Sequence, residues 1–210
     1  MNVGTMKGKS HEVVETADRR KLDVAGLQET RYRGVESATQ SRTQVRWLKG
    51  KDSAYKFFWS GNPEGINGVG ILLAKKWTEN VFDVQRISDR IILLKLIIGK
   101  TVFTIISVYA PQQGRPAAEK ERFYDQLQSV TAKVPLSEVL IPLGDWNSHV
   151  GASADGYEES MEASAMGNAK LRVKDFLILL IHIHMVICNT MFKNRDSHLI
   201  TCFRRPQNPG

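Results

Sequence analysis

The clearest pattern of apolar positions lies in the middle of the chain. Residues 91–98 and 101–109 are almost continuously Ile, Leu and Val, and the Gly-Lys dipeptide between them suits a two-residue hairpin turn. Such continuous apolar content predicts that both faces of these strands are buried. Residues 116–134 follow with apolar side chains at helical spacing, and residues 139–145, VLIPLGD, form the next expected strand. The pattern therefore predicts a sheet that is covered on both sides.

Weaker patterns flank this region. Val13, Val14 and Ala17 predict an amphipathic helix, and a short apolar strand from Leu22 to Leu27 follows it. Further strands are expected at residues 45–48, 56–61, 69–77 and 184–192, and a further helix at residues 171–180. Strands joined by hairpins, with helices outside them, predict an α+β fold in a single domain over residues 1–210.

Composition narrows the class of protein. Hydrophobic residues make up 42% of the chain and charged residues 24%, which is typical of a globular domain. Two cysteines favour a reducing, intracellular compartment over a disulfide scaffold, and the nucleus and the cytoplasm both stay open. We expect no signal peptide, and the 12-residue apolar run at 176–187 is too short to span a bilayer.

The charge of the chain points to its partners. Twenty-nine Lys and Arg against 22 Asp and Glu give a net charge of +7, and the pI is about 9.5. An excess of this size favours polyanions such as nucleic acid, although a solvated basic surface without a partner is the simpler alternative.

Polar residues follow several of the apolar runs. Glu29, Tyr109 and Asp145 each come at the end of an expected strand, Asn147 lies two residues further on, and Asn2 precedes the first helix. Strand ends that gather at one rim of a sheet are a usual place for a functional site. A carboxylate with amide and phenol groups suits one Mg²⁺ ion and a phosphate. Ordinary turn chemistry around Asp145 and Asn147 is the alternative reading.

Five motifs carry a family resemblance in the same order as in the family. They are NVGT (2–5), LQET (27–30), NGVGILL (67–73), SVYAPQ (107–112) and GDWNSHVG (144–151). With them the chain resembles the endonuclease/exonuclease/phosphatase family. Three further segments, DGYE (155–158), CNTMF (188–192) and DSHLIT (196–201), make it similar to the endonuclease domains of LINE-type retrotransposons.

The resemblance implies a four-layer α/β sandwich and cleavage of DNA phosphodiesters with Mg²⁺, or with Mn²⁺ in its place. By position in the motifs, Glu29 would hold the metal, and Asn2 would orient that carboxylate and the phosphate. Tyr109 would donate a hydrogen bond to a phosphate oxygen. Asp145 and Asn147 would position and activate the attacking water or assist the leaving group.

The chain departs from the family after residue 201. The family's site includes a later Asp and an Asp-His pair, whereas this sequence continues CFRRPQNPG. We therefore expect a domain that lacks the family's last strands and is impaired in cleavage. A catalytically silent domain that binds nucleic acid or a protein is the alternative function. A phosphatase or phospholipase is a third possibility, against which the basic charge and the LINE-type motifs argue.

Other residues invite weaker interpretations. His182, His184, Cys188, His198 and Cys202 match no zinc-ligand spacing, so core or edge positions are expected for them. His149 lies in a motif but is assigned no chemistry. Trp47, Trp59 and Trp77 are expected to pack in the core and not to stack on bases, and Trp146, beside Asp145, is the exception.

Overall fold

The computed structural model describes residues 1–34, 44–51 and 53–147. The expected helix 171–180, the expected strand 184–192, His149 and the late histidines and cysteines lie outside these residues. Within the described part of the chain, no helix is long and apolar enough to span a membrane.

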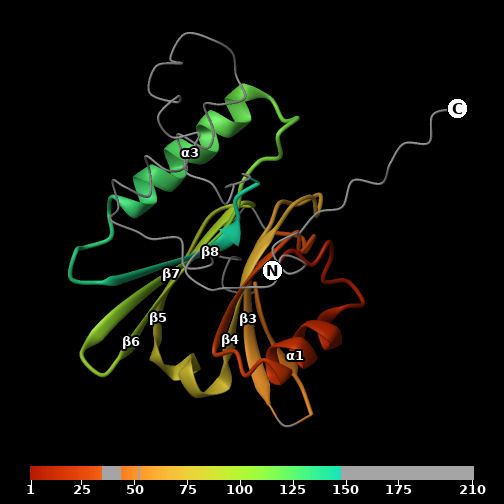
Figure 1. Ribbon diagram of the computed structural model, residues 1–210, viewed down its shortest axis with the longest axis vertical. Helices are drawn as coiled ribbons and strands as arrows, with labels where there is room; N and C mark the ends of the chain where they lie inside the picture. Colours follow the sequence, from red (N-terminus) through yellow and green to blue (C-terminus); the bar gives the residue numbers. More distant parts are fainter. Residues whose placement is uncertain (35–43, 52, 148–210) are drawn as a thin grey trace, which may run out of the picture. The chain divides into compact units, whose positions relative to one another are not determined.

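The first sheet has four antiparallel strands and lies beside one helix (Figure 1). Its elements are α1 (Ser10–Arg19), β1 (Val24–Gln28), β2 (Val45–Lys49), β3 (Ala54–Ser60) and β4 (Val69–Ala74). The strand order is β1-β4-β3-β2, which places β2 at an edge. Val13, Val14 and Ala17 of α1 are buried in one cluster with Phe57 and Leu72 of the sheet. The helix predicted from the apolar spacing is therefore confirmed.

The second sheet contains the most apolar part of the sequence. Its elements are β5 (Val81–Ser88), β6 (Ile91–Ile98), β7 (Thr101–Tyr109), α3 (Ala117–Thr131) and β8 (Val139–Asp145). The order is β5-β6-β7-β8, and only the β7–β8 pair is parallel, so α3 forms the crossover between two parallel strands. The expected hairpin is confirmed, with Ile98 opposite Thr101 and Gly99 at φ 63°, where glycine is favoured.

The two sheets pack face to face. Phe58, Ile71 and Leu73 from the first sheet share a buried cluster with Ile92 and Ile105 from the second. With α1 beside the first sheet and α3 beside the second, the described residues form four layers (Figure 1). The predicted α+β sandwich is confirmed.

One predicted strand was wrong in its extent, and one strand was missed. The strand expected at residues 69–77 ends at Ala74, and Lys75–Asn80 form a 3₁₀ helix, η1. This turn carries the chain from one sheet to the other, and its Trp77 packs against the inter-sheet cluster. β5 then follows, with register shifts that interrupt its alternation of polar and apolar residues. Tertiary packing, which a local pattern does not contain, decides both features.

The tryptophans divide between core and surface. Trp59 and Trp77 pack against the two apolar clusters, as expected. Trp47 is 44% exposed on the edge strand β2, so the prediction of a core position was wrong for this residue. An edge strand is covered on fewer sides than a central one, which leaves room for an exposed ring.

Candidate active site

The topology brings the sequence-predicted residues to one end of the sandwich. Tyr109 and Asp145 are the last residues of β7 and β8 and lie side by side in their parallel pairing. Glu29 follows the last residue of β1, and Asn2 is bridged to that last residue, Gln28. The strand order therefore gathers side chains that are distant in the sequence.

Close packing between β1 and β8 keeps these strand ends together. A Cβ added at Gly26 of β1 would lie 2.7 Å from Leu143 Cβ in β8 and 3.1 Å from Ser107 Oγ in β7. Only glycine fits at this distance without moving a backbone, so β1 packs closely on β7 and β8 two residues before the end of β1.

Glu29 is the centre of the hydrogen bonding. Its Oε1 accepts a 2.7 Å bond from the Tyr109 hydroxyl and a 2.9 Å bond from Asn2 Nδ2. Asn2 Nδ2 also lies 3.2 Å from Asp145 Oδ2, so one amide bridges two carboxylates. The guanidinium of Arg31 lies 3.6 Å from the other oxygen of Glu29. Four of the five predicted site residues are thus joined in a single network.

The network shifts the acidity of its members. Burial alone raises the pKa of Glu29, but hydrogen bonds from Asn2 and Tyr109 and the charge of Arg31 outweigh it, and the pKa is lowered from its usual 4.5. Burial, with the hydrogen bond to Glu29 next, raises the pKa of Tyr109 to about 12. At neutral pH the site therefore holds an ionised carboxylate and a neutral phenol that donates to it.

Asn147 is brought to the site through its backbone. Its N–H donates a 3.1 Å bond to Asp145 Oδ1, and its side-chain Nδ2 donates a 2.6 Å bond to the carbonyl of Ala110. Its φ is 47°, in the left-handed region that asparagine tolerates. The turn that Asn147 closes therefore also holds the carboxylate of Asp145 in position.

A cleft of about 340 Å³ opens beside Glu29. Its lining residues are Glu29, Arg31, Gly65, Ile66, Asn67, Arg90, Tyr109, Gln112 and Arg115. Three arginines and one carboxylate line the cleft, and Glu119 beside it pairs with two of the arginines. The excess of positive charge suits an anionic ligand.

Arg90 bonds to residues from several parts of the cleft wall. Its guanidinium donates to the Tyr109 carbonyl at 3.2 Å, to Asn67 Oδ1 at 3.3 Å and to Glu119 Oε1 at 2.8 Å. It also stacks on the Tyr109 ring at 5.0 Å. Arg115, on the loop before α3, forms a second ion pair with Glu119 at 3.0 Å.

Sequence reasoning missed the arginines. Arg90 immediately precedes the apolar strand β6, and a charge at the edge of a fully buried run was the available signal. Nothing local indicated that Arg90 would meet Glu119 of α3, because this pairing depends on the crossover. Arg31 and Arg115 lie just beyond the LQET and SVYAPQ motifs, where charge alone did not separate them from solvated residues.

Glu29 could hold one Mg²⁺ ion. Its carboxylate and that of Asp145 lie on either side of the Asn2 amide. The described residues contain no cluster of three or more His, Cys, Asp and Glu that could enclose an ion. Mg²⁺ is usually held by one or two carboxylates and keeps several waters, so it needs no such cage.

Comparison with known proteins relates 95% of the chain to two mammalian sequences. No family model matches. Craniofacial development protein 2 of Tragulus javanicus is 27% identical over 202 residues, which cover 95% of this chain and 33% of that protein. The protein of the same name from Bos taurus is 26% identical over 202 residues, which cover 95% of this chain and 32% of the relative. The chain thus spans about a third of the length of the curated relatives it matches.

Solved structures decide the fold. The endonuclease domain of TRAS1, a telomere-specific non-LTR retrotransposon, gives a TM-score of 0.52 at 19% identity over 87% of this chain and 68% of that one. The AP endonuclease LMAP of Leishmania major gives 0.55 at 14% identity, again over 87% of this chain, and 65% of that one. The fold is that of the endonuclease/exonuclease/phosphatase proteins. The resemblance drawn from the five motifs is confirmed at the level of the fold.

Within this endonuclease/exonuclease/phosphatase fold, four of the five motifs supply the hydrogen-bonded network. NVGT contributes Asn2, LQET contributes Glu29 and SVYAPQ contributes Tyr109. Asp145 comes from the described start of GDWNSHVG. The strand ends of both sheets thus bring these four residues together.

Proposed function

We propose that this chain is a Mg²⁺-dependent, endonuclease-like domain of retrotransposon origin that cleaves DNA phosphodiesters. The observation that carries the proposal is the network in which Asn2 and Tyr109 both donate to Glu29 at the wall of an arginine-lined cleft. A phosphodiester brings negative charge, which the arginines match, and its cleavage needs an ionised metal ligand, which the lowered pKa of Glu29 provides.

Glu29 would hold the metal ion, and Mn²⁺ could replace Mg²⁺. When bound, the ion supplies positive charge that stabilises the developing charge on the phosphoryl oxygens. Asn2 orients the carboxylate of Glu29 through its 2.9 Å hydrogen bond. The same amide reaches Asp145, so the two carboxylates keep a fixed separation.

Tyr109 and the arginines would bind the phosphate. The Tyr109 hydroxyl stays protonated at neutral pH, since its pKa is about 12. Its one proton is donated to Glu29, and a metal ion bound at Glu29 would release this proton for a hydrogen bond to a phosphate oxygen. Arg31 and Arg115 are 58% and 49% exposed at the cleft and can pair with flanking phosphates. Arg90 is buried and holds the Tyr109 backbone in place.

Asp145 would accept the proton of the attacking water. As water adds to phosphorus, one proton leaves the nucleophile and the bond to the leaving oxygen breaks, so a base beside the phosphate speeds the reaction. The Asn147 backbone N–H fixes one oxygen of Asp145 and the Asn2 amide meets the other. An intracellular setting, in the nucleus or the cytoplasm, is part of this proposal because the substrate is DNA.

Nicking of supercoiled plasmid by the purified chain tests the function. We expect nicking with Mg²⁺, none with EDTA, and a loss of at least about 100-fold in Asp145→Asn, the size of a general base contribution. Circular dichroism confirms that each sample is folded.

Two results would count against the proposal. A folded chain that shifts DNA at low salt but never nicks it would support the alternative, a silent binding domain. Nicking that persists in EDTA would contradict the role of the metal ion, and nicking that persists in Asp145→Asn would contradict the role of Asp145.

A further inference from the structure

The edge strand β2 carries an exposed aromatic ring at a place that the second sheet does not cover. β1 packs against β7 and β8, and β3 packs against β5, which is itself the edge of the second sheet. Val45, Trp47 and Lys49 alternate on one side of β2. Val45 packs on the inter-sheet cluster, whereas Trp47 is 44% exposed and Lys49 is exposed. The side of β2 thus passes from core to solvent along three alternate positions.

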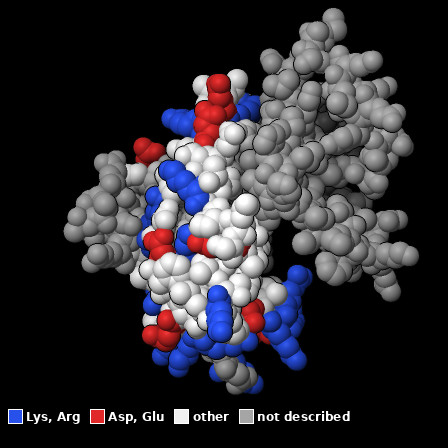
Figure 2. Space-filling model, turned by 90° about the vertical axis from the view of Figure 1, so that its left-hand side faces the viewer, with Lys and Arg blue, Asp and Glu red and all other residues white. Residues whose placement is uncertain are grey.

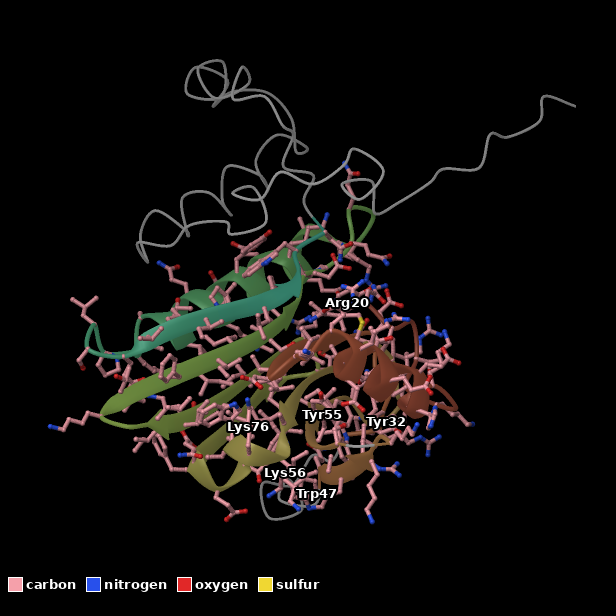
Figure 3. The ribbon with its side chains drawn as sticks, turned by 60° about the horizontal axis from the view of Figure 1, so that its bottom comes forward. Arg20, Tyr32, Trp47, Tyr55, Lys56 and Lys76 are labelled. Carbon is pink, nitrogen blue, oxygen red and sulfur yellow. The ribbon has the colours of Figure 1, made fainter. Side chains whose placement is uncertain are left out.

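A lysine lies against this ring from the neighbouring strand. Lys56 is directly opposite Trp47 in the β2–β3 register. Its Nζ lies 5.7 Å from the centre of the Trp47 ring and 5.7 Å from the centre of the Phe58 ring. Figure 3 shows Trp47 and Lys56 next to each other at one end of the molecule. We call the group Trp47, Lys49 and Lys56 the Trp47 platform.

Within the described part of the chain, no acidic side chain neutralises the lysines of the platform. Residues 44–60 contain Arg46, Lys49, Lys51 and Lys56 but only one acidic residue, Asp52. Among the residues that the structure describes, neither Lys49 nor Lys56 takes part in an ion pair. Figure 2 shows many Lys and Arg side chains, with some Asp and Glu among them, at the lower end of the molecule, where the β2–β3 turn lies in Figure 1.

The Trp47 platform is separate from the cleft. Trp47 pairs with Lys56, Lys56 with Leu73, and Leu73 with Val24, which lies four residues before Gln28 at the site end of β1. The platform is therefore about 13 Å away along the strands and about 14 Å across three strand spacings. A ligand on the platform does not occupy the cleft.

We propose that the Trp47 platform binds single-stranded nucleic acid, with one base stacked on Trp47 and the adjacent phosphates paired with Lys49 and Lys56. An exposed indole beside unpaired ammonium groups provides both a stacking surface and charge complementary to a sugar-phosphate chain. In a duplex the bases are already stacked on one another, so single strands are the form that this ring can engage. The inference does not depend on cleavage in the cleft.

Binding of a fluorescein-labelled oligothymidylate of about twenty nucleotides, long enough for typical single-strand sites, tests the proposal by anisotropy with the full chain. Trp47→Ala is expected to weaken binding about 5- to 150-fold, which corresponds to one lost base stack. Trp47→Phe keeps an aromatic ring and is expected to stay within about threefold of the wild type. The double variant Lys49→Ala/Lys56→Ala is expected to lower the slope of log affinity against log salt by about 1.4.

Two control variants separate the platform from general charge. Glu121→Gln removes one exposed negative charge from α3, outside both the cleft and the platform, and is expected to leave binding of the oligothymidylate within about twofold. Lys133→Ala removes one exposed charge just after α3 and is expected to leave binding within about twofold.

Three outcomes would overturn the proposal. One is equal binding by Trp47→Ala and the wild type, both folded by circular dichroism. Another is a loss in Trp47→Phe as large as in Trp47→Ala, since stacking would then not be the cause. The third is displacement of the oligonucleotide by polyglutamate at equal charge concentration, which would indicate an acidic protein partner.

Discussion

The hydroxyl of Tyr109 donates a 2.7 Å hydrogen bond to Glu29, a residue 80 positions earlier in the chain. The bond joins the end of β7 in one sheet to the residue after β1 in the other. It therefore connects the packing of the sandwich to the ionisation of the site.

Removal of this hydroxyl should raise the pKa of Glu29. In Tyr109→Phe the carboxylate loses one of the hydrogen bonds that lower its pKa, so we expect the value to move up toward 4.5. The free energy of unfolding should fall by about 1.5–3 kcal/mol, as for a hydrogen bond to a charged group. Carboxyl NMR titration measures the first effect and urea unfolding the second. Tyr32→Phe, which removes a hydroxyl that contacts Ser10, should leave the Glu29 titration unchanged.

The stability of the chain should depend on pH through Glu29. Because its pKa is lower in the folded state than the usual 4.5, the ionised carboxylate stabilises the fold above pH 4.5. This contribution is lost as the pH falls through the lower, folded-state pKa. The unfolding free energies of wild type and Glu29→Gln, measured in EDTA, should differ by a constant amount near neutrality. Below pH 4.5 the wild type should lose stability relative to the variant. A difference that stays constant down to strongly acidic pH would contradict the lowered pKa.

The two arginines that share Glu119 should differ sharply in importance. Arg90 is 9% exposed and donates to Tyr109, Asn67 and Glu119. Arg90→Ala should therefore lower the free energy of unfolding by about 3–5 kcal/mol, the range for breaking a buried ion pair. Arg115 is 49% exposed, and Arg115→Ala should cost no more than about 1 kcal/mol. Urea unfolding of both variants checks the contrast. Equal costs would show that burial of Arg90 is not what matters.

The features of the fold and the site that the sequence predicts are those that depend on residues close together in the chain. The Gly-Lys hairpin and the helix with Val13, Val14 and Ala17 follow from local spacing, and both were predicted. Asn2, Glu29, Tyr109 and Asp145 were selected from the motifs, and the fold brings their side chains together. Their roles as site residues stay a prediction.

Features that depend on contacts between layers were missed or wrong. β5 mixes polar and apolar residues because register shifts interrupt it, so its periodicity gives a weak signal. Trp47 is exposed because β2 lies at an edge, and no local pattern reveals the order of strands in a sheet. The bond from Arg90 to Glu119 depends on where the crossover helix lies.

Two buried threonines offer a matched test of hydrogen bonding. Thr30 Oγ1 is buried without a hydrogen-bond partner among the described residues, so Thr30→Val should change the free energy of unfolding by less than about 0.5 kcal/mol. Thr104 is equally buried and donates a 2.5 Å bond to Glu138, which also pairs with Lys95. Thr104→Val should therefore cost about 1–3 kcal/mol. Thermal or urea unfolding distinguishes the two, and a larger cost for Thr30→Val would reverse the assignment.

Calorimetric titration of Mn²⁺ into the purified chain tests most directly the claim that Glu29 is the centre of a metal site. We predict that the wild type binds one ion. Glu29→Gln should lower the affinity for Mn²⁺ by at least about tenfold, which corresponds to about 1.4 kcal/mol. The control Glu79→Gln, which changes an exposed residue of η1, should leave the affinity unchanged. Equal Mn²⁺ binding by Glu29→Gln and the wild type would contradict the account.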